Sequence, residues 1–503
     1  MLARLSPRLL LLAIAFFFLL SLLTLNRSGF DPKNIKPTIP NIPSTADLWK
    51  DPKHGPSKPS PAIKKFWAKW ANIFHESRPQ VEPIKVKEAA STANSDNANG
   101  ERKPHKHNLG LSDKVINGLH DAHKSLLQDR GGLYGSRFSN QSRELFSGTG
   151  IVTVAGGPYF APVIISIRML RKVTSMPVHV FLESQGEYEP EICEHVLPSL
   201  NAECFVVSDF MPKDSPIKPT HYQLKALAIL FSTFETIVYI DSDCFPVRDP
   251  AEMLTSEPFL STGLITWPDY WVATEDPVFY TIAGMTSFPP GMPARSTESG
   301  ELLISKNIHL SSLLLACYYN LFGPTHYYPL LSQGALGEGD KETFLAAAVV
   351  LGLPYYRVKE HVATIGYFTA EGDFKGGAMV QHHAVDDASV HNGTYATAAD
   401  SHKCRPVFLH ANFPKMNAGR LLEENKLTTP TGKALRIWGK KTDVEKKFEG
   451  RDIEKEVWAE MKDVSCALET VIRDWRGHGG ICTRVKEHWS AVFAEGSFLS
   501  GII

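Results

Sequence analysis

Residues 236–247 read TIVYIDSDCFPV, an apolar run that ends in two aspartates. TIVYI is rich in β-branched and aromatic residues, a composition typical of a buried strand. Side chains of an extended chain alternate between faces, so Asp241 and Asp243 point the same way, with Cα atoms about 7 Å apart. Carboxylates at that spacing suit Mg²⁺ or Mn²⁺. The stretch therefore predicts a strand that leads into a metal site, with an ion-free Asp-Ser-Asp turn as the alternative interpretation.

Strand and helix patterns alternate on the amino side of this stretch. Three short apolar segments read as buried strands, and two longer segments have apolar residues at helical spacing. The strands are 150–154, 178–183 and 202–207, and the helices are 160–173 and 221–234. This alternation predicts an α/β fold, a single Rossmann-like domain with helices on both faces of the sheet. Ligands bind at the carboxyl ends of such strands, where Gly156, Gly157 and the two aspartates fall.

The composition limits the classes of function. The chain has 503 residues, of which 43% are hydrophobic and 21% charged, as in globular proteins. Its 53 basic and 54 acidic residues give a formal charge of −1, so no overall field recruits nucleic acid. Any anion must therefore be bound by local charge.

The seven cysteines contain no C-x-x-C pair, which argues against a zinc or redox motif and allows disulfides. Cys193 and Cys204 are close in the sequence, and so are Cys466 and Cys482. These are the two candidate pairs.

The N-terminus predicts a membrane anchor. Arg4 and Arg8 precede LLLLAIAFFFLLSLLTL at residues 9–25, which is long enough to span a thin bilayer. We expect a cytoplasmic tail (1–8) and an uncleaved signal anchor in a Golgi membrane, with the rest of the chain lumenal. A removed signal peptide is the alternative.

Residues 26–108 are rich in Pro, Ser, Lys and Asn, which predicts a disordered lumenal stem. Within it, AIKKFWAKWANIF (62–74) has helical spacing, and we expect a transient helix there. An amphipathic pattern begins at Leu111, so the folded catalytic domain is expected at residues 109–503.

The stretch YQLKALAILFSTFETIVYIDSDCFPVRDP (222–250) resembles the core segment of the fungal Golgi mannan α-mannosyltransferases. Five further segments match in the family's order and extend the resemblance over roughly residues 110–430. They are GIVTVAGG (150–157), TWPDYW (266–271), STESGELLISK (296–306), GEGDKETF (337–344) and FLHANFPKMN (408–417).

This resemblance implies a single-pass type II membrane enzyme that transfers mannose from GDP-mannose to α-mannose acceptors on cell wall mannan glycoproteins. The same order of motifs is similar to that of glycogenin-like retaining transferases, which implies a GT-A type domain. Family members form α-1,2 or α-1,3 linkages, and α-1,2 branching is the expectation for this chain. The linkage, an N-linked or O-linked acceptor, and a double-displacement or front-face mechanism stay open.

The resemblance also implies roles for individual residues. Asp241 and Asp243 match the metal-binding D-x-D, and His410 matches the histidine that completes the site for Mn²⁺, or Mg²⁺. Lys415 matches a basic residue that meets the leaving diphosphate. From its position on the preceding helix, Lys225 would add a second positive charge, with a solvated lysine as the alternative. Gly156, Gly157 and Asp241 would also contact the donor.

Further candidates surround the sugar. Asp340 matches a carboxylate near the donor sugar, and Glu298 precedes a strand that lines it, so both are candidate catalytic residues. A helix-terminal charge and a turn residue are the respective alternatives. Trp267, Asp269 and Trp271 form an aromatic and acidic cluster suited to the acceptor, or alternatively to the core.

Three other functions remain open. The first is a transferase of the same fold with another nucleotide sugar, and the second is a non-catalytic mannan-binding subunit. The third is an aspartyl-phosphate phosphatase, which also carries a D-x-D behind a strand, although no partner motif follows here. A complex with other Golgi mannosyltransferases is the partner that the resemblance suggests.

Overall fold

The computed structural model describes residues 57–92, 100–129, 132–134, 137–391, 403–424 and 426–494. The expected cytoplasmic tail and signal anchor lie outside the described residues. Among the helices of the described part, none is both long and apolar enough to cross a membrane.

A seven-stranded sheet forms the centre of the fold, in the order β3-β2-β1-β4-β7-β6-β8. Strands β1 to β4 run parallel to one another, whereas β7 pairs antiparallel with both β4 and β6. The strands are β1 (Thr149–Val154), β2 (Val178–Leu182), β3 (Ala202–Val206), β4 (Thr236–Ile240), β6 (Leu264–Val272), β7 (Arg295–Ser305) and β8 (Tyr356–Arg357). The predicted α/β architecture is confirmed, whereas the antiparallel direction of β7 was not part of the prediction.

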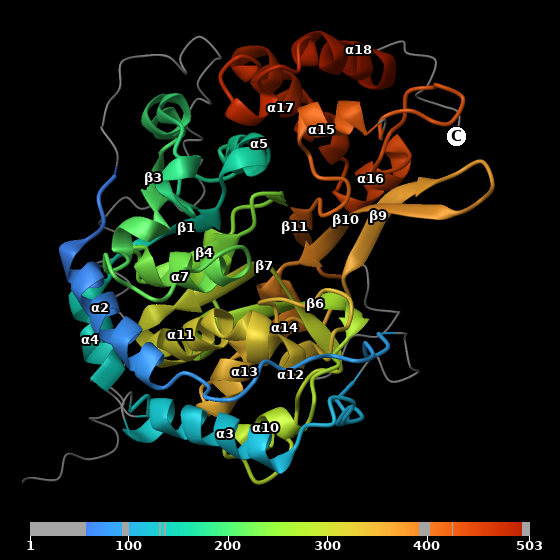
Figure 1. The fold of residues 1–503 in the computed structure, drawn as a ribbon. Helices are drawn as coiled ribbons and strands as arrows, with labels where there is room; N and C mark the ends of the chain where they lie inside the picture. Colours follow the sequence, from blue (N-terminus) through green and yellow to red (C-terminus); the bar gives the residue numbers. More distant parts are fainter. Residues whose placement is uncertain are drawn as a thin grey trace, which may run out of the picture. The chain divides into compact units, whose positions relative to one another are not determined.

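Helices cover both faces of this sheet, as the alternation predicts (Figure 1). Neighbouring residues of β1 show why, because Ile151 belongs to one apolar cluster and Val152 to another. Helix α5 (Phe160–Leu170), all of whose residues are buried, packs in the first cluster. Helices α7 (Gln223–Phe231) and α11 (Lys306–Leu321) pack in the second. Shorter helices join the strands: α6 (Leu197–Ser199), α8 (Ala251–Leu254), α9 (Phe259–Thr262), α10 (Val278–Ile282), α12 (Tyr328–Ser332) and α13 (Thr343–Val350).

A second, four-stranded antiparallel sheet has the order β5-β11-β10-β9. Its strands are β5 (Cys244–Pro246), β9 (Ala363–Phe368), β10 (Phe374–His382) and β11 (Pro406–His410), and helix α14 (Ala384–His391) follows β10. Strand β5 begins directly after Asp243, and its Cys244 pairs with His410 of β11. This pairing brings the two sheets together at the end of β4.

The C-terminal residues form helices α15 (Ala418–Glu423), α16 (Lys441–Lys447), α17 (Ile453–Leu468) and α18 (Ile481–Phe493). Helix α17 packs on α5, where Arg168 donates to Glu460 at 2.6 Å, and α16 and α18 pack on α17. The predicted disulfides Cys193–Cys204 and Cys466–Cys482 both form, and the second joins α17 to α18.

The expectation of a transient helix within a disordered stem is wrong for residues 61–76. They form α2 (Pro61–Glu76), whose apolar face is buried in the second cluster. Trp67 is fully buried and makes an edge contact with Phe231 of α7, with ring centroids 5.3 Å apart. Figure 1 shows α2 beside α4 (Arg137–Leu145), and the next helix in the chain after α2 is α3 (Asp113–Lys124). Apolar residues at helical spacing over about four turns give α2 a face that the protein can bury, and this outweighs the polar composition of the residues on either side of it.

Candidate metal centre and active site

Asp241, Asp243 and His410 come together where β4 and β11 end. Each offers one ligand atom, and these atoms all lie within 4.8 Å of one another. Two backbone hydrogen bonds fix the arrangement: the N–H of Asp241 donates to the carbonyl of Gly300 at 2.7 Å, and the N–H of Ala411 donates to the backbone carbonyl of Asp243 at 2.9 Å. Asp243 and His410 are buried, whereas Asp241 is partly exposed. The structure thus brings together the three side chains that were predicted as metal ligands, and their binding of an ion stays a prediction.

The electrostatics of His410 fit a site for a cation. Its Nε2 lies 3.4 Å from Asp243 Oδ1, and its Nδ1 lies 3.4 Å from Glu298 Oε1. Nδ1 is buried and makes no well-formed hydrogen bond with the described residues. Burial opposes a charge on His410, but the two carboxylates outweigh it and raise its pKa well above the usual value. Two carboxylate oxygens and an imidazole are also a donor set that Mn²⁺ accepts.

Gly300 makes the approach of His410 possible. A Cβ built at this position would lie 2.4 Å from His410 Nδ1 and 2.9 Å from Glu298 Oε1. The sequence analysis did not single out Gly300 and placed Glu298 before the strand, whereas both residues lie within β7. Any larger residue would displace the imidazole from the aspartates.

Lys225 is not the solvated helix lysine of the alternative interpretation. Its side chain is 8% exposed, with Nζ 3.3 Å from Asp241 Oδ1 and 3.1 Å from Asp340 Oδ2. It also donates to the carbonyl of Ser299 at 2.6 Å. Burial lowers the pKa of Lys225, but Asp241 and Asp340 more than offset this and raise it. Lys225 therefore links the aspartate pair to Asp340.

Tyr239 supports Asp241 from within β4. Its hydroxyl donates to Asp241 Oδ1 at 2.7 Å. The sequence analysis did not name Tyr239, although its place two residues before Asp241 puts both side chains on one face of the strand.

Lys415 reaches the site from the loop after β11 and forms an ion pair with Asp243. Burial raises the pKa of Asp243, but His410 and Lys415 outweigh it and hold the pKa well below its usual range. The Lys415 side chain is 43% exposed. It is thus the accessible positive charge of the site, as expected for a group that meets an anion.

The two candidate catalytic carboxylates differ in their surroundings. Glu298 accepts from the N–H groups of Ser299 and Gly300 at 3.0 and 2.7 Å. Burial raises its pKa, but His410 and the Gly300 N–H lower it to about 2, so Glu298 is ionised. Asp340 is buried, which raises its pKa, and Lys225 partly offsets the effect.

The acceptor assignment is wrong for Trp267. Its ring is fully buried against Phe408, with centroids 5.4 Å apart, and its indole N–H donates to the carbonyl of His382 at 2.8 Å. Asp269 is also buried and is held by Lys341 Nζ at 2.7 Å. Trp271 is partly exposed, which leaves it as the member of this cluster that can reach a ligand.

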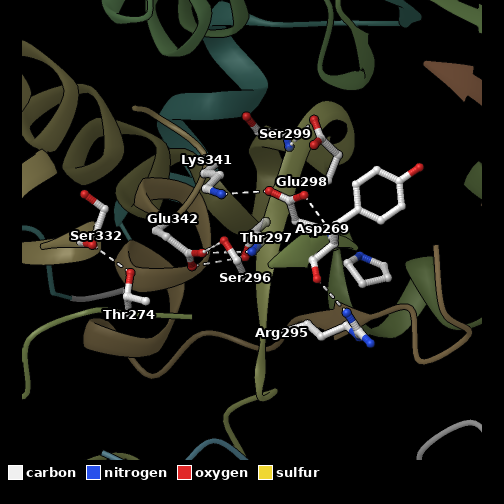
Figure 2. A network of polar contacts seen from close by, with 12 residues as sticks. Asp269, Thr274, Arg295, Ser296, Thr297, Glu298, Ser299, Ser332, Lys341 and Glu342 are labelled. Carbon is white, nitrogen blue, oxygen red and sulfur yellow. Dashed lines mark hydrogen bonds and ion pairs between the residues drawn. The ribbon is translucent and has the colours of Figure 1, made fainter. Parts of the chain in front are cut away.

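Contacts from the segment before α13 hold it against β6 and β7 (Figure 2). Lys341 reaches Asp269 of β6, and Glu342 accepts from Ser296 Oγ at 2.6 Å and Thr297 N–H at 2.8 Å on β7. These flanking contacts fix the backbone on the carboxyl side of Asp340. The acidic residues of GEGDKETF thus have different surroundings: Glu342 anchors the segment and Asp340 faces Lys225.

The predicted donor-binding glycines lie just beyond β1. Gly156 and Gly157 have φ values of 125° and 49°. A Cβ at Gly156 would lie 2.5 Å from the carboxylate of Glu187, so this turn requires glycine. Their contact with a donor stays a prediction.

Residues 148–290 and 285–383 match the family model described as "Mannosyltransferase putative". The chain is 35% identical over 410 residues to the alpha-1,2-mannosyltransferase MNN21 of Candida albicans, covering 68% of this chain and 62% of that protein. It is 30% identical over 439 residues to MNN23 of the same organism, covering 71% and 72%. The chain thus spans less than two thirds of the length of MNN21. A crystal structure of galactosyltransferase LgtC with donor and acceptor sugar analogues aligns over 44% of this chain and 76% of that one, at 14% identity and a TM-score of 0.27.

Proposed function

This chain belongs to the fungal mannan mannosyltransferase family, and from that membership we propose that it transfers mannose from GDP-mannose to α-mannose acceptors on glycoprotein mannan. The proposed reaction retains the α configuration and forms α-1,2 branches, in keeping with the names of the relatives. The observation that carries the proposal is the convergence of Asp241, Asp243 and His410 within 4.8 Å. The domain is proposed to be of the GT-A type, lumenal in the Golgi and anchored by residues 9–25.

Asp241, Asp243 and His410 would hold Mn²⁺, or Mg²⁺, at the end of β4. When bound, the ion would supply Lewis-acid charge to the leaving diphosphate. Lys415 would bind phosphate oxygens, because it is exposed on one side and paired with Asp243 on the other. Breaking a bond between sugar and phosphate depends chiefly on such charge at the leaving group.

The buried groups would position this machinery. Lys225 holds Asp241 and Asp340 at 3.3 and 3.1 Å and so fixes the distance between a proposed metal ligand and the carboxylate of Asp340. Glu298 keeps the His410 ring in place from the side opposite Asp243. We therefore assign Glu298 to positioning His410, and Asp340 to orienting the sugar.

The test uses the full-length chain with GDP-mannose and α-mannooligosaccharide acceptors, in Mn²⁺ or in EDTA. Asp243→Asn removes one ligand charge with little change of volume, and Asp373→Asn, at an exposed aspartate in the β9–β10 turn, is the matched control. We expect EDTA or Asp243→Asn to lower the transfer rate by at least a factor of about 100, which is about 3 kcal/mol, and Asp373→Asn to leave it unchanged. Digestion of the product with a linkage-specific mannosidase then identifies the bond.

The alternatives give different results in the same assay. Transfer from a different nucleotide sugar, with none from GDP-mannose, would favour the other donor. Binding of mannan without turnover of any donor would favour a non-catalytic subunit. Equal transfer by wild type and Asp243→Asn would contradict the metal site.

A further inference from the structure

A second cluster of metal-ligating side chains lies outside the proposed active site. Glu360, His391 and Cys404 each offer one ligand atom, and these atoms lie within 4.8 Å of one another. All three residues are buried, with 1%, 2% and 5% of their surface exposed. They come from three segments: the turn after β8, the last residue of α14, and the residues just before β11.

The spacing of these three ligand atoms is close to that of a small coordination shell. His391 Nε2 lies 3.2 Å from Glu360 Oε2, and the sulfur of Cys404 lies within 4.8 Å of the ligand atoms of both residues. Ligand atoms about 3.3–3.7 Å apart are the edges of a tetrahedron around an ion with bonds of about 2.0–2.3 Å. Only small shifts of the side chains are therefore needed for them to share an ion.

Asp387 supports the cluster from behind. Its Oδ1 accepts from the N–H of Glu360 at 2.7 Å, and its Oδ2 accepts from the hydroxyl of Tyr356 at 2.7 Å. The N–H of Lys359 donates to both oxygens, at 3.1 and 3.0 Å. Asp387 thus fixes the backbone that carries Glu360 and lies one helical turn before His391. Such outer hydrogen bonds typically orient the ligands of a metal site.

We propose that Glu360, His391 and Cys404 bind a structural Zn²⁺ ion. A thiolate, an imidazole and a carboxylate are the side chains that Zn²⁺ takes as ligands, whereas Mn²⁺ prefers oxygen. Burial of all three ligands suits a structural role, and because structural Zn²⁺ is four-coordinate, one further ligand would complete the site. The absence of a C-x-x-C pair does not exclude it, because here the ligands come from distant segments.

This site is separate from the D-x-D centre. Cys404 precedes β11 and His410 ends it, so an extended chain places them up to about 20 Å apart. The ion would tie the end of α14 and the turn after β8 to the start of the strand that carries His410. It would therefore stabilise the four-stranded sheet without contacting the substrate.

The first test measures zinc in the full-length chain, purified without a metal-affinity step, by mass spectrometry of the elements. We expect about one zinc per chain after dialysis that removes Mn²⁺. Replacement of zinc by Co²⁺ should give the thiolate-to-cobalt charge-transfer absorption. Asp243→Asn should keep the zinc and this absorption, so the result does not depend on the proposed transferase activity.

Variants then assign the ligands. Cys404→Ala and His391→Ala should lose the zinc, and Cys404→Ala should also lose the charge-transfer absorption. Cys317→Ala, at another buried cysteine in α11, is the matched control and should keep both. The proposal is overturned if wild-type protein dialysed against Zn²⁺ holds no zinc, a result that does not depend on whether any variant folds. It is also overturned if folded Cys404→Ala keeps the zinc and the absorption.

Discussion

Helix α2 should contribute to the stability of the folded domain, and Trp67→Ala tests this directly. Trp67 is fully buried, its ring contacts Phe231 and Phe74 with centroids 5.3 and 5.8 Å away, and its indole N–H points at Met211 Sδ at 3.2 Å. Truncating a buried tryptophan to alanine costs about 3–5 kcal/mol, because apolar burial is lost and a cavity remains. We therefore expect unfolding to become easier by about 4 kcal/mol.

Thermal unfolding of the full-length chain, followed by circular dichroism, measures the effect. At about 2.1 cal/mol/K per residue, a folded region of roughly 400 residues has an unfolding entropy near 0.8 kcal/mol/K, so about 4 kcal/mol lowers Tm by about 5 °C. Lys65→Ala, at an exposed position of the same helix, is the matched control and should change stability by less than about 0.5 kcal/mol. If Trp67→Ala lowers Tm no more than Lys65→Ala does, α2 does not unfold together with the domain and the reasoning fails.

Three further changes have defined outcomes. Burial raises the pKa of Glu454 from 4.5 to about 7. Its contribution to the free energy of unfolding is therefore complete below about pH 4.5 and is lost as pH rises through 7, and the total loss is about 3 kcal/mol. Glu454→Gln should remove this dependence on pH, so Tm should fall less between pH 5 and pH 8 in the variant than in the wild type. An equal fall in Tm in the two proteins would contradict the role of Glu454. Replacing Cys466 and Cys482 by alanine opens a loop of 16 residues and should lower the free energy of unfolding, measured in denaturant, by about 3 kcal/mol. An unchanged free energy of unfolding would contradict this expectation. Lys225→Met leaves Asp241 and Asp340 without their shared partner. It should lower the free energy of unfolding, measured in denaturant, by about 3–5 kcal/mol without metal and by less in Mn²⁺. Equal losses with and without Mn²⁺ would contradict the proposed ion.

Much of the central sheet follows from local patterns. The strand and helix segments predicted between residues 150 and 240 lie close to their predicted positions, because the strands are short apolar runs and the helices have apolar residues at helical spacing. The antiparallel direction of β7 could not be predicted in this way. Strand direction depends on how the chain returns to the sheet, and no local pattern records that.

The errors have physical causes too. Composition favoured disorder before residue 108, but the apolar stripe of α2 needed only a surface such as α7 to bury it, and composition does not reveal that surface. In TWPDYW, alternation along the strand puts Trp267 and Asp269 on one face, and that face is buried. The same alternation puts Trp271 on that face as well, so it could not separate Trp271, which is partly exposed because β6 is buried only as far as Asp269.

Contacts between distant parts of the chain complete the candidate site. The D-x-D is visible in the sequence, and the resemblance supplied His410, but the link of Lys225 to Asp340 and the need for Gly300 arise only in three dimensions. Neither the contact between Lys225 and Asp340 nor the glycine at position 300 belongs to a motif that could be recognised from its spacing in the sequence. Side chains that hold a site together are therefore harder to predict than those that would touch its ligand.

The pairing of β5 with β11 has a consequence for the order of synthesis. The ribosome makes Asp241 and Asp243 about 170 residues before His410, which at 5–20 residues per second is roughly 10–30 s. During that interval the two aspartates exist without their histidine, and a chain that stops before β11 never acquires it. The three proposed ligands are thus present together only on chains that extend past β11, so the proposed metal binding would distinguish these chains from those interrupted before it.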